Sequence, residues 1–229
     1  MSVLVELAVF NLSSVDVAAQ CNVHRIELCS DYAVGGVSPS LNDFLEARKN
    51  FKGKIFVMIR LRPGNFVYSD DEFDLIISTM LLFKNAGADG FVAGFLTDDA
   101  KVNITQTQNF VNACAPLPVT FHRAIDECSN YGDAVDAVVK CGVKRILSTG
   151  TAPSAFQGKQ LLNDIQQKYS DQLIVVAGGG VRSRGLSDFL IDTTISEVHS
   201  AAIMPGNADV ADADEVSRLK SICDAIEGL

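Results

Sequence analysis

The feature that most constrains the fold of this chain is an eightfold alternation of strand-like and helix-like segments. The strand-like runs, rich in β-branched and aromatic residues, are Val3–Phe10, His24–Cys29, Lys54–Leu61, Gly90–Leu96, Val119–Arg123, Arg145–Ser148, Leu173–Ala177 and Ile195–Ala201. The helix-like stretches that follow them are Ser13–Gln20, Leu41–Lys49, Asp70–Asn85, Thr105–Ala115, Tyr131–Cys141, Gly158–Tyr169, Gly185–Ile191 and Asp214–Ile226. Strands that alternate with helices predict a parallel sheet, and eight such units predict closure into an α/β TIM (β/α)8 barrel.

The alternative α/β fold is an open, doubly wound sheet. That fold normally carries a glycine-rich turn after its first strand, and no G-x-G-x-x-G motif follows the first strand-like run here. Composition does not shift along the chain, and we find no linker or low-complexity segment. We therefore expect a single domain that spans residues 1–229.

The charge and the cysteines limit the partners and the compartment. A net charge of −9 without clusters of Lys or Arg argues against nucleic acid and anionic membranes as partners. The N-terminus lacks a basic export signal, and no apolar run approaches the roughly 18 residues of a membrane span. Six scattered cysteines without a C-x-x-C motif indicate reduced thiols, so we expect a cytoplasmic protein.

Ionisable and polar side chains recur near the ends of five strand-like runs, often two residues apart. In a strand, residues i and i+2 face the same side, and in a closed barrel such side chains converge on the C-terminal mouth. TIM-barrel enzymes place their active sites at this mouth. The candidate catalytic residues are Glu6, Glu27, Arg60, Arg62, His122, Asp126, Glu197 and His199.

These residue types suit acid–base chemistry on an anion. Glu27 or Glu197 would be the general base and His122 the acid or electrophile, while Arg60 and Arg62 would clamp the anion. The alternative is a buried network that only fixes the barrel, in which Arg60 would pair with Glu6 or Glu27. Two histidines, which titrate near neutral pH, favour the functional interpretation.

A glycine-rich turn, Gly178 to Gly180, follows the seventh strand-like run. Backbone N–H groups at such turns bind anions, and the loops after strands 7 and 8 form the usual phosphate site of a TIM barrel. The candidate anion-binding residues are Gly150, Gly179, Gly180 and Ser200. The alternative is that the glycines only permit a tight turn.

The chain resembles the CutC family, whose proteins are named for copper homeostasis. The resemblance rests on Arg25-Ile-Glu-Leu-Cys29, Val57-Met-Ile-Arg60, Val119-Thr-Phe-His-Arg-Ala124, Gly178-Gly-Gly-Val181 and Glu197-Val-His-Ser-Ala201. It implies a TIM barrel in a cytosolic, homo-oligomeric protein linked to copper. It also implies ligation of Cu(I) by cysteines near the first two strands, where this chain has Cys29 but Ala8 in place of the first cysteine.

Three functions therefore stay open. The resemblance favours copper homeostasis with Cys29 as a soft ligand for Cu(I), beside a histidine. The residues favour an enzyme of the lyase, isomerase or hydrolase type that acts on a small phosphorylated or carboxylated metabolite at the barrel mouth. In the third, the polar mouth is only a stabilising network.

Overall fold

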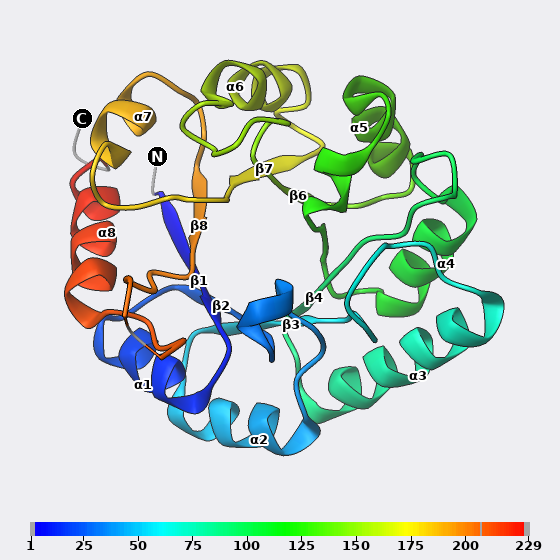
Figure 1. Ribbon diagram of the computed structural model, residues 1–229, viewed down its shortest axis with the longest axis horizontal. Coiled ribbons are helices and arrows are strands. Elements are labelled where there is room, and N and C mark those ends of the chain that lie inside the picture. Colours follow the sequence, from blue (N-terminus) through cyan, green and yellow to red (C-terminus); the bar gives the residue numbers. More distant parts are fainter. Residues whose placement is uncertain (1–2, 207, 227–229) are drawn as a thin grey trace.

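The computed structural model describes residues 3–206 and 208–226, and at its centre eight parallel strands form a closed barrel (Figure 1). The strands are β1 Leu4–Val9, β2 Arg25–Leu28, β3 Lys54–Met58, β4 Gly90–Ala93, β5 Val119–Phe121, β6 Arg145–Ser148, β7 Ile174–Ala177 and β8 Glu197–Ser200. The barrel closes where β8 pairs in parallel with β1, so that Leu4 lies opposite Glu197. This closure confirms the predicted TIM (β/α)8 barrel and excludes the open sheet.

A ring of α-helices surrounds the barrel (Figure 1). They are α1 Leu12–Gln20, α2 Leu41–Asn50, α3 Asp70–Ala86, α4 Ile104–Cys114, α5 Tyr131–Lys140, α6 Lys159–Lys168, α7 Leu186–Ile191 and α8 Ala213–Ile226. Two short 3-10 helices, η1 Tyr32–Val34 and η2 Arg123–Glu127, follow β2 and β5. Within the described residues, no helix combines the length and apolar character that crossing a lipid bilayer requires.

Local sequence signals set the helix ends. Ser69 and Glu72 form a capping box at the start of α3, in which each side chain accepts a hydrogen bond from the other residue's backbone N–H. Gly87, with φ of 96°, ends the same helix in the left-handed region that glycine adopts without strain. The main apolar core lies between these helices and the outward-facing side of the strands.

The inside of the barrel contains charged side chains. On the inward-facing side of β2 and β3, Arg25 and Phe56 pack together, with the guanidinium carbon 4.8 Å from the ring centroid. Arg145 of β6 lies over the same ring at 5.5 Å. A Cβ at Gly90 would lie 2.6 Å from this ring, so glycine is required there to leave room for Phe56. The ring thus fills the interior beneath the barrel mouth.

Candidate functional site

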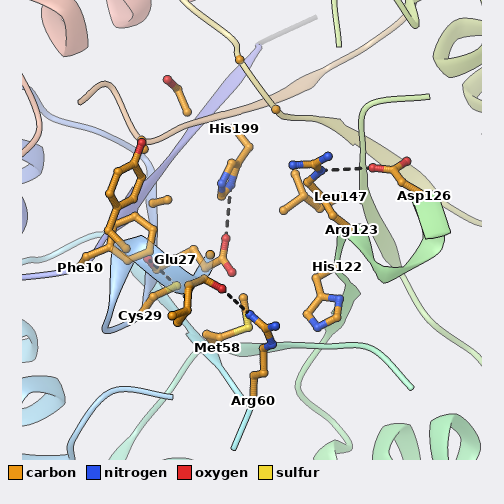
Figure 2. Close-up of a pocket in the computed structure, with 18 of the residues that line it drawn as sticks. Phe10, Glu27, Cys29, Met58, Arg60, His122, Arg123, Asp126, Leu147 and His199 are labelled. Atoms are coloured by element: carbon orange, nitrogen blue, oxygen red, sulfur yellow. Dashed lines mark hydrogen bonds and ion pairs between the residues drawn. The ribbon is translucent and has the colours of Figure 1, made fainter. Parts of the chain in front are cut away.

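A cavity of about 490 Å³ opens at the carboxyl ends of the strands (Figure 2). Predicted site residues that line it are Glu27, Cys29, Arg60, His122, Asp126, Gly179, Gly180, His199 and Ser200. Lining residues that were not among the predicted site residues include Met58, Phe66, Arg123 and Arg182. The cavity therefore brings together side chains from β2, β8 and the loops after β3, β5 and β7.

Four predicted residues lie outside this cavity among the described part of the chain: Glu6, Glu197, Arg62 and Gly150. Glu6 and Glu197 each precede a residue of the cavity lining by two positions, Ala8 and His199 respectively. Inward-facing residues alternate along a strand, so both carboxylates lie one level deeper in the barrel. The prediction that Glu197 shares the cavity with Glu27 is wrong for this reason.

The deeper carboxylates belong to a buried ion-pair network around Arg25, a residue that the sequence analysis did not identify as a candidate. Arg25 Nε donates to Glu6 and its Nη2 donates to Glu197. Arg145 Nε donates to Glu197 Oε2 at 3.2 Å. Burial alone would raise the pKa of Glu6, but Arg25 and His199 outweigh it and lower that pKa to about 2. The structural alternative paired Arg60 with Glu6 or Glu27. Among the described residues, Arg60 forms no ion pair with Glu6.

His199 connects this network to the cavity. Its Nδ1 lies 2.7 Å from Glu6 Oε1. The same atom is 3.4 Å from Glu27 Oε2 (Figure 2). Burial would lower the pKa of His199, but the bond to Glu6 and the charges of both carboxylates raise it. The imidazole therefore favours its protonated form between two carboxyl groups. Glu6, Glu27 and His199 also supply two oxygens and one nitrogen within 4.8 Å of one another, a donor set for a divalent cation rather than for Cu(I).

Glu27 is the carboxyl group that faces the cavity. It is 2% exposed, and its Oε1 has no hydrogen-bond partner among the described residues. Burial raises its pKa to about 7, although His199 acts in the opposite direction. A carboxyl group with this pKa exchanges protons near neutral pH, as a general acid or base requires.

Arg60 and His122 lie side by side at the opposite wall (Figure 2). The Arg60 guanidinium donates from Nη1 to the carbonyls of Val34 and Gly36 and from Nη2 to Gly64. Burial and the charge of Arg60 lower the pKa of His122 to about 3, so the imidazole is neutral. The predicted clamp of two arginines is wrong, because Arg62 lies outside the cavity.

Arg62 instead stabilises the loop before α3. Its Nε donates to Glu72 Oε1 at 2.5 Å, and its guanidinium carbon lies 5.0 Å from the centroid of the Tyr68 ring. β3 ends at Met58, and beyond a strand end the rule that residues i and i+2 share a side no longer holds. Arg62 therefore does not follow Arg60 into the cavity.

The carboxylate of Asp126 lines the cavity but is used by the protein itself. It accepts hydrogen bonds from Ser148 Oγ at 2.5 Å and from the Thr149 backbone N–H at 3.0 Å, and it pairs with Arg123 at 3.2 Å. These bonds attach η2 to the end of β6. Gly150 does not line the cavity, and its backbone N–H donates to Ser148 Oγ at 2.9 Å.

The glycine-rich turn after β7 does reach the cavity. Gly179 and Gly180 line it with φ values of 94° and 76°, so the turn needs glycine at both positions. The Ser200 hydroxyl donates to the Val181 carbonyl at 2.7 Å and accepts from the Ala202 N–H at 3.1 Å. Ser200 therefore shapes this turn, while Arg123 and Arg182 bring positive charge to the same side of the cavity.

Cys29 belongs to a small buried cluster that also contains Phe56, Met58 and Val92. Burial and the nearby Glu27 raise the pKa of its thiol well above the usual value. Cu(I) prefers thiolate and thioether sulfur, and the cavity lining offers one of each in Cys29 and Met58. These donors therefore fit Cu(I) as a site of one thiolate and one thioether, in which the Cys29 thiol must first lose its proton. They do not supply a pair of thiolates.

The family model for the CutC family matches residues 3–204. The chain belongs to the CutC family. A CutC family protein from Vibrio vulnificus is 37% identical over 201 residues, which cover 87% of this chain and 80% of the relative. The copper homeostasis protein cutC homolog of Homo sapiens is 34% identical over 199 residues, 87% of this chain and 73% of the relative.

A crystal structure of a CutC protein from Streptococcus agalactiae has the same fold, with a TM-score of 0.81 and 27% identity over 87% of this chain and 98% of that chain. The family resemblance inferred from the strand-end motifs is thus confirmed, and so is the CutC barrel. The CutC name connects the chain to copper homeostasis, but it assigns no role to any residue of the cavity.

Proposed function

We propose that this CutC protein is an enzyme that transfers a proton to or from a small anionic substrate, with Glu27 as the acid–base group. One observation carries the proposal. The unpaired Oε1 of buried Glu27 shares a cavity with three arginine side chains, Arg60, Arg123 and Arg182. A purely structural network seldom leaves a buried carboxyl oxygen without a partner, because that arrangement costs stability.

Glu6 lies one level deeper in the barrel than the cavity that Glu27 lines, and we assign these two carboxyl groups separate roles. Glu6 is held by Arg25 and His199, so it orients the imidazole and stays ionised. His199 in turn contacts Glu27 Oε2, while Oε1 has no hydrogen-bond partner among the described residues. Glu27 can then accept a substrate proton at Oε1 while His199 stabilises the carboxylate form.

The substrate anion would lie near the turn after β7. Gly179 is close to Arg123, since a Cβ there would be 3.6 Å from the guanidinium carbon. The Arg123 side chain is 54% exposed and is therefore able to move toward a ligand. Backbone turns of this kind with an adjacent arginine bind phosphate or carboxylate groups.

A thermal-stabilisation screen of phosphorylated and carboxylated metabolites tests this proposal. Arg123→Gln should abolish the stabilisation by an anion that wild type binds, and Glu27→Gln should retain binding but lose turnover. Arg218→Gln is a matched control, because Arg218 is 55% exposed and pairs with Glu215 at the same i,i+3 spacing as Arg123 with Asp126. If no anion stabilises the wild-type protein, the proposal is wrong.

The second candidate function is Cu(I) binding, which the pairing of Cys29 with Met58 in one buried cluster favours. Titration of reduced protein with Cu(I) against a competing chelator tests it in Cys29→Ser and Met58→Leu. Binding that neither substitution weakens would remove both ligand assignments. A cytosolic location and self-association, which the family resemblance implies, remain predictions.

A further inference from the structure

Two hydrogen-bond donors at the cavity wall lack a partner among the described residues: Arg60 Nε and His122 Nε2. Both atoms are buried, and both residues line the cavity beside Glu27. A buried donor without an acceptor destabilises the folded protein. Two such donors in one cavity wall point to an acceptor that arrives with the substrate.

The hydrogen bonds of each side chain leave the unpaired nitrogen available to a ligand. Nη1 of Arg60 donates both of its hydrogens to loop carbonyls and Nη2 donates one, which leaves Nε–H and the second Nη2–H. The Nδ1 of His122 accepts from the Ala124 N–H at 3.2 Å, so in the neutral ring the proton is on Nε2. His122 is therefore a single N–H donor, and Arg60 Nε–H is the second donor without a partner among the described residues.

An aromatic ring holds the two donors together. Phe66 lies 4.7 Å from the His122 ring, centroid to centroid, and its centroid is 4.9 Å from the guanidinium carbon of Arg60. Gly94 provides the space on the other side of His122, since a Cβ there would lie 2.5 Å from the imidazole. Neither side chain can turn away without a clash or the loss of these contacts.

We propose that Arg60 Nε–H and His122 Nε2–H bind one oxygen of a substrate carbonyl and stabilise the enolate that forms when Glu27 removes the adjacent C–H proton. This inference rests on the proposed function. The C–H bond breaks, its proton passes to Glu27 Oε1, and its electron pair forms the C=C bond while the carbonyl π pair moves to oxygen. Return of the proton to the original carbon completes an exchange. Where that carbon also bears a hydroxyl group, the hydroxyl proton passes to the former carbonyl oxygen and the C–H proton returns to the neighbouring carbon, which completes an isomerisation with no oxidant or reductant.

The chemistry of the donors selects this substrate class. A neutral imidazole that donates from Nε2 suits an oxygen whose negative charge grows during the reaction. Arg60 Nε–H and His122 Nε2–H supply two donors for one oxygen, whereas the end-on fork of Arg60 is closed to a phosphate because both Nη1 hydrogens are used. The substrate is thus an aldehyde, ketone or keto acid with a C–H next to its carbonyl and an anionic group at the Arg123 end.

Planar enolate analogues and matched saturated ligands test the inference by calorimetry. The pairs are phosphoglycolohydroxamate with glycerol 3-phosphate, and oxalate with lactate. Wild type should bind the planar member of at least one pair at least about tenfold more tightly. In His122→Asn, where the shorter side chain can still cap the Ala124 N–H, this preference should disappear while the saturated member binds as before.

A measurement on the wild-type protein tests the same role of His122 without a substitution. Nitrogen NMR of His122 should show Nε2 protonated and Nδ1 unprotonated from about pH 5 to about pH 8, with the Nε2 proton shifted when the planar ligand binds. Loss of binding by all four ligands would overturn the proposed function and this inference together. Binding of the anions without a planar preference, or a preference that His122→Asn retains, would overturn this inference alone.

Discussion

Replacing Glu27 by glutamine should stabilise the protein above neutral pH, although the change removes an ionisable group from the candidate site. Burial raises the pKa of Glu27 from 4.5 to about 7, against the influence of His199. A carboxyl group whose pKa is higher in the folded state contributes its full stability only below the pKa of the unfolded chain. That contribution is lost as the pH rises from 4.5 to about 7.

The size of the effect follows from these two values. The difference between 4.5 and about 7 corresponds to about 3 kcal/mol, at about 1.4 kcal/mol for each pKa unit. Glutamine has nearly the same shape and does not ionise, so Glu27→Gln should lack the loss. At about pH 8 its melting temperature should exceed that of wild type by roughly 6–12 °C for a chain of this size. The charged or titratable groups that act on Glu27 are His199, Glu6, Cys29 and Arg25.

Glu6→Gln is the matched control, because Glu6 is buried in the same cluster but has the opposite pKa shift. Its pKa is lowered to about 2, so its contribution is present above pH 4.5 and is lost only as the pH falls toward 2. Glu6→Gln should therefore lower the free energy of unfolding at neutral pH by about 3 kcal/mol.

Urea unfolding of the three proteins at about pH 4.5 and about pH 8 measures both effects. The free energy of unfolding of Glu27→Gln should increase relative to that of wild type from the lower to the higher pH. If both substitutions destabilise the protein equally at about pH 8, Glu27 is an ion-pair partner like Glu6. The assignment of Glu27 to function would then be refuted.

Substitutions of Arg25 and Gly90 test the deeper level of the barrel. Arg25→Met should lower the free energy of unfolding by about 3–5 kcal/mol, because it leaves two buried carboxylates without their main partner. Arg62→Met, in a half-buried ion pair at the surface, should cost about 1 kcal/mol or less in the same urea titration. Gly90→Ala should cost about 1–3 kcal/mol by overpacking against Phe56, and a second change, Phe56→Leu, should recover part of that loss in differential scanning calorimetry.

The barrel could be predicted from the sequence because its signal is local and repeated. Each strand is a short run of β-branched or aromatic residues, and most helices begin at a capping side chain, as at Ser69 and Asn130. The ends of the strands were less predictable. Arg60 and His122 were placed inside strands, but β3 ends at Met58 and β5 at Phe121. Both side chains still reach the cavity because the chain stays near the barrel axis for two residues.

The pairing of charges could not be read from the sequence. Arg25 opens its strand, where a charged residue is usually solvated, and only the register of the closed barrel places it between Glu6 and Glu197. Arg25 and Glu197 are far apart along the chain. Only closure of β8 onto β1 brings them together in space, and no local pattern encodes that closure. Closure therefore decides which carboxylates pair with Arg25 and which one faces the proposed substrate site.

The balance of charge inside the barrel agrees with the proposed function, in which Glu27 transfers a proton. Arg25 and Arg145 together match Glu6 and Glu197, so the deeper network is neutral. Glu27 and His199 remain, and their environment raises the pKa of both. A proton that passes from one to the other changes no net charge in the cluster. An anion at the Arg123 end or a carbonyl at His122 would shift the position of the proton without unbalancing the barrel, as reversible proton transfer requires.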